Sequence, residues 1–193
     1  CGLINDTAIL RIQIKGDWTA QTAKGEISHG REVLFFGPQS RRMPISVTGS
    51  FISVGISLRP GASHALKSPK LSEALDSIVL MNQYDHRGNS IFDQFDPKAS
   101  PEDWAATMEK LVRGWVAHVG AKPPDPLSAR FETLAFTDPS ASIADFARDC
   151  GVDQRRLERA IRRDFGLSPK KVLRRARALD MASHLRGVAD QAE

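Results

Sequence analysis

Residues 141–179 constrain the fold of this chain more than any other stretch, because helical periodicity alternates there with sharp turns. The small side chain of Ala147 suits a close crossing of two helices, and Gly151 suits a turn four residues later. Leu157 follows six residues further on, at an inward position of the next helix. Small, turn-forming and apolar residues at these offsets predict a helix-turn-helix.

Capping residues indicate where the helices of this segment begin and end. Ser142 can cap the first helix, and Asp153 can cap the second. Gly166 can end the second helix in a left-handed conformation, and Pro169 suits the first turn of a third helix. We therefore expect the second helix to end near Gly166 and the third to start at Pro169.

Positive charge is concentrated in the second and third of these helices. Residues 154–177 contain ten arginines and lysines against two acidic residues, a net charge of +8. The whole chain carries +4, so the remainder carries −4. A basic stretch on an otherwise acidic chain is typical of a surface that binds a polyanion, although a solvated helix face is the alternative.

In a helix-turn-helix that binds DNA, the second helix enters the major groove and its first turns meet the base edges. Outward residues further along, and those that open the next helix, meet phosphates. The candidates for base contacts are Gln154, Arg155, Arg156 and Arg159. The candidates for phosphate contacts are Arg162, Arg163, Lys170 and Lys171. A helical bundle that binds no nucleic acid is the alternative interpretation.

Residues 142–185 resemble the first helix-turn-helix of the AraC/XylS transcription regulators, most specifically in LERAIRRDFGLSPKKVLRRARAL with its G-L-S-P turn. Asp153 stands where that family usually has Ser or Thr, and Ile161 stands where Phe is usual. The resemblance implies a cytoplasmic, sequence-specific transcription regulator, an activator or a repressor, with recognition helix 153–165. Its implied partners are double-stranded promoter DNA, RNA polymerase and a second copy of the chain. Because the family carries two such units, the domain over residues 142–193 is expected to be incomplete, as in a fragment.

Residues 7–58 show the pattern of several short strands. Apolar and polar residues alternate in AILRIQIK and FISVGISL, and EVLFF is a short apolar run. Predicted turns at residues 16–17, 28–30, 37–38 and 48–49 separate them. This spacing predicts a small antiparallel barrel or sandwich.

Helices are expected after residue 59. Short ones are predicted in residues 62–81, with Ser72 as a cap, and in residues 90–95. Residues 100–119 form a clear amphipathic pattern that Ser100 can cap. Three prolines within residues 121–126 then exclude continued helix. The predicted domains are therefore a β-rich unit over 1–120, a linker with a short helix over 121–141, and the helix-turn-helix domain.

The region FFGPQSRRMPISVTGSFISVGISLRPGASHAL is similar to the N-terminal domain of some of these regulators. That similarity implies a cupin-like domain that senses a small-molecule effector or mediates dimerisation. Arg41, Arg42 and Arg59 are candidates to bind an anionic effector, with loop solvation as their alternative role. The predicted fold class is thus α+β, a cupin-like barrel or sandwich followed by helices and then by an all-α helix-turn-helix domain.

Other chemistry finds little support in the sequence. The five histidines show no paired spacing for a metal, and no phosphate-binding loop or nucleophile motif appears. We therefore expect no enzyme activity, metal or cofactor. No apolar run reaches the ~20 residues that span a bilayer, and two cysteines offer no disulfide framework. The rival interpretation is a cupin-like small-molecule binding or enzymatic domain whose C-terminal helices are structural.

Overall fold

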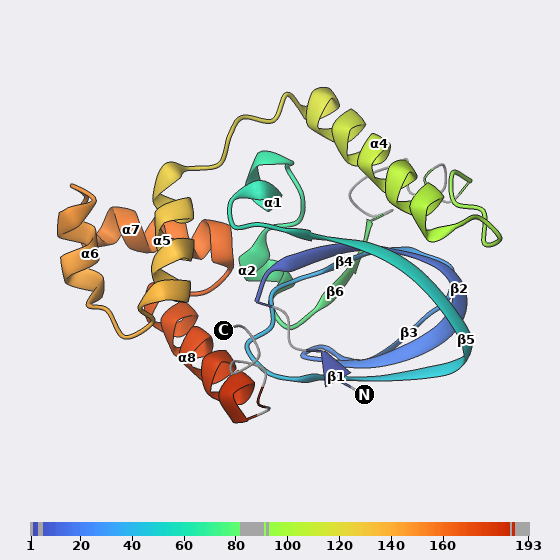
Figure 1. The fold of residues 1–193 in the computed structure, drawn as a ribbon, viewed down its shortest axis with the longest axis horizontal. Coiled ribbons are helices and arrows are strands. Elements are labelled where there is room, and N and C mark those ends of the chain that lie inside the picture. The colour runs from blue at the N-terminus through green and yellow to red at the C-terminus, as the bar shows by residue number, and fades with distance from the viewer. Residues whose placement is uncertain (1, 4–5, 82–90, 92, 186, 188–193) are drawn as a thin grey trace.

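A computed structural model of the chain describes residues 2–3, 6–81, 91, 93–185 and 187. Within these residues, six strands form one antiparallel sheet in the order β1-β5-β2-β4-β6, with β3 paired to β2. The strands are β1 (Gly2–Leu3), β2 (Ala8–Thr22), β3 (Gly25–His29), β4 (Val33–Phe36), β5 (Met43–Leu58) and β6 (Ile78–Leu80). The sheet curls into an open half-barrel on one side of the molecule (Figure 1).

Two of the predicted turns lie inside long strands. Asp17 of β2 pairs with Thr48 of β5, and the register is irregular just before Asp17. Gly16 has a φ of +93°, and a Cβ atom there would lie 2.5 Å from the carbonyl oxygen of Ser50. These turn-forming residues therefore make a bulge that bends two continuous strands, rather than ending them.

The predicted turn at residues 28–30 is also partly strand. His29 pairs with Trp18, so β3 continues through it. The chain reverses between β2 and β3 at residues 23–24 instead. The turn propensity of residues 28–29 is overridden because β3 forms a ladder of backbone hydrogen bonds with β2.

Each face of the sheet covers a separate core, as the alternation of side chains requires. One face packs beneath α4 (Pro101–Val119), which contributes Met108. The other face carries a second cluster of buried side chains. The buried residues of the first face include Ala8, Leu10, Ile12, Ile14, Val33 and Phe35. Those of the second are Trp18, Ala20, Leu34, Phe36, Met43 and Ile45.

The segment after β5 contains less helix than predicted. Helices α1 (Ala62–Ala65) and α2 (Leu71–Ala74) are single turns, and Lys70 rather than Ser72 is the N-cap of α2. Residues 78–80 pair with β4 as strand β6, because their apolar side chains complete the sheet. Of the helix expected over residues 90–95, the structure describes residues 91 and 93–95, and residues 93–94 form a turn.

Helix α4 begins as predicted. The Ser100 hydroxyl accepts a hydrogen bond from the Asp103 amide at 3.1 Å, and the Asp103 carboxylate accepts one from the Ser100 amide, which completes a capping box. The indole of Trp104 donates to the Asp96 carbonyl at 2.8 Å.

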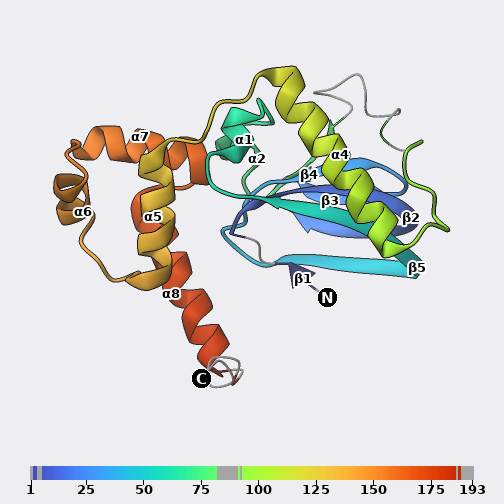
Figure 2. The same cartoon turned by 45° about the horizontal axis from the view of Figure 1, so that its top comes forward.

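After α4, the only regular elements among the described residues are helices joined by short connections. They are α5 (Pro126–Thr137), α6 (Ile143–Asp149), α7 (Gln154–Phe165) and α8 (Pro169–Leu185). Helix α5 comes from the stretch predicted as linker and short helix, yet it packs into the same core as α6, α7 and α8. We call helices α5 to α8 the helical half, and the strands with α1, α2 and α4 the sheet half. Figure 2 shows the helical half beside the sheet half. The α+β prediction, a β-rich half followed by an all-α half, is confirmed.

Candidate nucleic-acid interface

Side-chain caps define the helices of the helix-turn-helix. The Ser142 hydroxyl accepts a hydrogen bond from the Asp145 amide at 3.3 Å, and the Asp153 carboxylate accepts one from the Arg156 amide at 2.6 Å. Gly151 adopts a φ of +65° in the turn between α6 and α7, and Gly166 adopts +72° at the end of α7. Both glycines thus occupy the left-handed region that other residues rarely adopt.

One face of α7 is buried in the helical core. Leu157 and Ile161 are fully buried, and Ala147 of α6 is 2% exposed where α6 meets α7. Phe131 of α5 lies against this core with its ring edge-on to Phe165, the centroids 5.7 Å apart. The burial of this face fixes which side of α7 is left facing outward.

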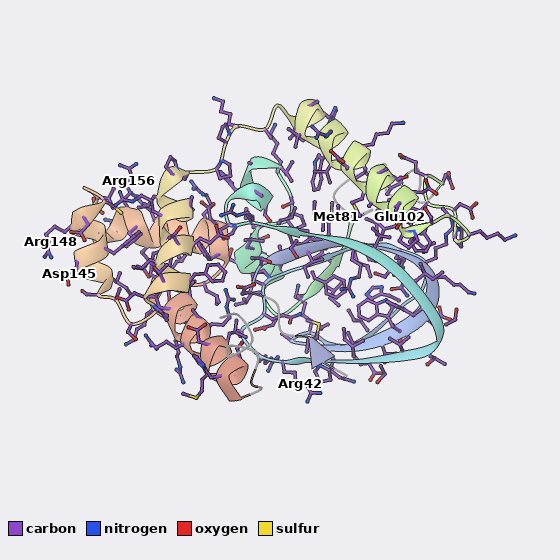
Figure 3. The ribbon with its side chains drawn as sticks, viewed as in Figure 1. Arg42, Met81, Glu102, Asp145, Arg148 and Arg156 are labelled. Carbon is purple, nitrogen blue, oxygen red and sulfur yellow. The ribbon has the colours of Figure 1, made fainter. Side chains whose placement is uncertain are left out.

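The outward side of α7 presents Gln154, Arg155, Arg156, Arg159 and Arg162, all exposed. A helix rises about 1.5 Å per residue, so this surface is roughly 12 Å long, close to the width of the major groove. In Figure 3, Arg156 lies on the side of the helical bundle that faces away from the sheet.

The arginines of α7 differ in the partners they already have. Within the part of the chain that the structure describes, Arg155, Arg156 and Arg159 form no ion pair. Arg162 donates to the Glu158 carboxylate at 2.8 Å, with both side chains exposed. Because exposed ion pairs are weak, Arg162 is available to another anion.

Arg163 is also exposed, but its guanidinium already has two carboxylate partners. Its guanidinium donates to Asp164 at 2.6 Å and lies 3.5 Å from the Asp125 carboxylate. The hydrogen bond to Asp164 raises the pKa of Arg163 above its usual value. Arg163 therefore differs from Arg155, Arg156 and Arg159 in its internal partners, while it remains at the surface.

The lysines that open α8 are exposed. Lys170 and Lys171 follow Pro169 directly, in the first turn after the Gly166 turn. Pro169 itself is buried, so the start of α8 is held against the rest of the bundle. Because only a short turn separates α8 from α7, these two lysines lie near the C-terminal end of α7.

Sequence reasoning missed the importance of Asp164. This residue is 1% exposed, and its carboxylate accepts hydrogen bonds from Ser128 of α5 at 2.5 Å and from Arg163. The sequence does contain a signal for this residue, because helical spacing places Asp164 with Ile161 and Phe165 on the inward face of α7. A carboxylate at such a position needs hydrogen-bond partners.

Arg175, one of the ten basic residues of the C-terminal stretch, is half-buried rather than outward. It donates to the backbone carbonyls of Asp6 at 2.9 Å and Gln39 at 3.3 Å. Burial lowers the pKa of its guanidinium from the usual value. Arg175 thus joins α8 to the sheet half.

Further contacts hold the two halves together. Gly166 lies so close to the sheet half that a Cβ atom there would be 2.9 Å from the Leu71 carbonyl oxygen. Arg59, considered above for an anionic effector, instead donates to Glu132 of α5 at 2.5 Å. The end of the candidate recognition helix is therefore in direct contact with the sheet half.

No family model matches this chain, and no curated protein does. Several solved structures are similar to it. CuxR is 18% identical, with a TM-score of 0.36 over 92% of this chain and 68% of its own. CuxR is described as an AraC-like transcriptional activator.

Two structures of ToxT from Vibrio cholerae are also similar to the chain. An apo variant is 13% identical, with a TM-score of 0.48 over 94% of this chain and 75% of its own. The wild-type protein with a bound unsaturated fatty acid is 12% identical, with a TM-score of 0.46 over 100% of this chain and 76% of its own.

None of the helices in the described ranges is long and apolar enough to cross a membrane. No group of three or more histidine, cysteine, aspartate or glutamate side chains there is arranged to hold a metal ion.

Proposed function

We propose that this chain is a sequence-specific DNA-binding transcription regulator of the AraC type, acting in the cytoplasm without catalysing a reaction. The observation that carries the proposal is the outward side of α7. It presents one glutamine and four arginines, three of which have no ion-pair partner in the described structure, on a helix whose other side is buried. Arginines that have no ion-pair partner on an exposed helix face can donate hydrogen bonds to guanine bases and to phosphate oxygens.

The proposed contacts follow the position of each side chain. Gln154, Arg155, Arg156 and Arg159 read base edges from the first turns of α7. Arg162, Lys170 and Lys171 bind phosphates beside the groove. Arg163, which is exposed and pairs with Asp164 and Asp125, is a further candidate for a phosphate contact.

We assign effector sensing or dimerisation to the sheet half. Its α1 and α2 segment packs against the C-terminal end of α7. A ligand that shifts this segment would shift α7 and change promoter occupancy or contact with RNA polymerase.

Replacing Arg155 or Arg156 with alanine should weaken binding to a preferred duplex by about 1–3 kcal/mol, or roughly 5-fold to 150-fold. The duplex would be selected from a random pool by the unaltered chain, and affinity would be measured by fluorescence anisotropy at several salt concentrations. The logarithm of the affinity of the unaltered chain should fall steeply with the logarithm of salt concentration.

Arg113→Ala is the matched control, because Arg113 is an exposed arginine of α4 in the sheet half. Its removal lowers the net charge by the same amount and should leave the base preference unchanged. A chain that fails to bind any duplex, or binds independently of salt, would contradict the proposed function.

A further inference from the structure

A groove of about 440 Å³ lies between residues 63–72 of the sheet half and the C-terminal part of α7. Four of its lining side chains are lysines or arginines, namely Lys67, Lys70, Arg162 and Arg163, and His64 lies beside them. No aspartate or glutamate is among its lining residues. The groove is therefore suited to an anion.

Packing holds the two walls of this groove in a fixed relation. The Leu71 carbonyl meets Gly166 at the end of α7, and Gly61 lies against Pro124, where a Cβ atom would be 2.6 Å from that ring. In Figure 2, α1 and α2 lie at the end of α7 that is opposite to α6. The sheet half thus extends the surface of α7 beyond its last turn.

Helical spacing connects the groove to the proposed reading surface. Arg155, Arg159 and Arg162 lie at positions i, i+4 and i+7, on one stripe of α7. Arg162 belongs both to this stripe and to the lining of the groove. Because the stripe already spans most of the width of a major groove, side chains beyond Arg162 would meet the phosphate backbone at its edge.

The lysines of the groove can exchange their present contacts for a phosphate. Lys67 is exposed and forms no ion pair with a residue that the structure describes. Lys70 pairs with Glu73 at 3.0 Å, with both side chains exposed. Such a pair is weak enough for a phosphate to compete with it.

We propose that Lys67 and Lys70 bind backbone phosphates of the DNA whose major groove α7 enters. The inference rests on the proposed function, and it makes the sheet half part of the DNA-binding surface. The contacts add affinity without sequence information, because phosphates are the same at every base pair. They also give the sheet half a direct influence on occupancy, since a movement of residues 63–72 would remove them.

The test is a double variant, Lys67→Ala with Lys70→Ala, in the complete 193-residue chain. Binding would be measured on the selected duplex and on a duplex with altered bases, across a series of salt concentrations. Loss of two phosphate contacts should reduce the slope of log affinity against log salt by about 2 and weaken both duplexes roughly 10-fold at moderate salt. The ratio of the two affinities should not change.

Two further variants complete the design. Lys15→Ala with Lys98→Ala removes the same charge from exposed positions elsewhere in the sheet half and should leave the slope unchanged. Lys67→Arg with Lys70→Arg keeps both charges and should retain binding. Circular dichroism would verify that each variant is folded.

The possible failures are distinct. If the unaltered chain binds no duplex, the proposed function fails. If it binds and the alanine double variant matches it in slope and affinity, this inference is overturned while the function stands. Tighter binding by the alanine variant would also overturn it, because residues 63–72 would then obstruct DNA.

Discussion

Phe131→Ala should lower the free energy of unfolding of the helical half by about 3–5 kcal/mol, the range typical of a fully buried phenylalanine. Phe131 of α5 has no exposed surface. Its ring meets Phe146 of α6 edge-on with centroids 5.4 Å apart, and it meets Phe165 of α7 at 5.7 Å. The substitution would leave a cavity where these three helices meet.

Urea denaturation followed by far-ultraviolet circular dichroism would measure this effect. All three tryptophans, Trp18, Trp104 and Trp115, lie in the sheet half, so their fluorescence follows that half separately. We expect the helical transition to move to lower urea and the fluorescence transition to move less, unless the contacts between the halves make unfolding a single event.

Phe136→Ala is the matched control on the same helix, since Phe136 is 72% exposed. It should change the free energy of unfolding by less than about 0.5 kcal/mol. Equal effects of the two substitutions would show that Phe131 does not hold α5 to the helix-turn-helix.

Asp164→Ala should destabilise the chain by about 2–4 kcal/mol, because it removes the shared partner of two groups. The Ser128 hydroxyl, which is buried, donates to Asp164 at 2.5 Å, and the Arg163 guanidinium donates to the same carboxylate. Partial exposure of Arg163 limits its share of this effect, since water can solvate it. Most of the cost comes from the unsatisfied Ser128.

Asp164→Asn should cost about half as much, since the amide oxygen can still accept from Ser128 while the charge is lost. Asp145→Ala provides a comparison at an exposed carboxylate, which pairs with Arg148 on the outside of α6 (Figure 3). Hydrogen bonding with Ser142 and pairing with Arg148 lower the pKa of Asp145. If Asp164→Ala were no more destabilising in thermal unfolding than Asp145→Ala, the buried network would have no structural role.

The ends of the helices were predictable because their signals are local. Ser100, Ser142 and Asp153 each accept a hydrogen bond from the backbone amide three residues ahead in the chain. Gly166 ends α7 through its own backbone angle. A residue that satisfies a helix end needs nothing from elsewhere in the fold.

The inward and outward faces of α7 were likewise apparent from spacing. Leu157 and Ile161 repeat at helical intervals on one face, so Arg155, Arg159 and Arg162 had to face away from the core. The composition of the outward surface follows from that pattern alone.

Long-range contacts decided the remaining features. The dipeptides at residues 16–17 and 48–49 look like turns, but they pair with each other within bent strands. Residues 78–80 lie in a stretch predicted as helix and become strand because β4 offers an unpaired edge. Propensity is a preference of about 1 kcal/mol or less per residue, which a ladder of hydrogen bonds and burial can exceed.

By itself, the sequence determined the helix-turn-helix, its caps and the basic side of α7, because each depends on residues within a few positions of one another. Only the tertiary structure decided that Arg163 and Arg175 make internal contacts while Lys67 and Lys70 lie beside α7. An arginine has the same charge wherever it lies. Its availability to DNA depends on carboxylates and carbonyls that are distant in sequence and come close only when the chain folds.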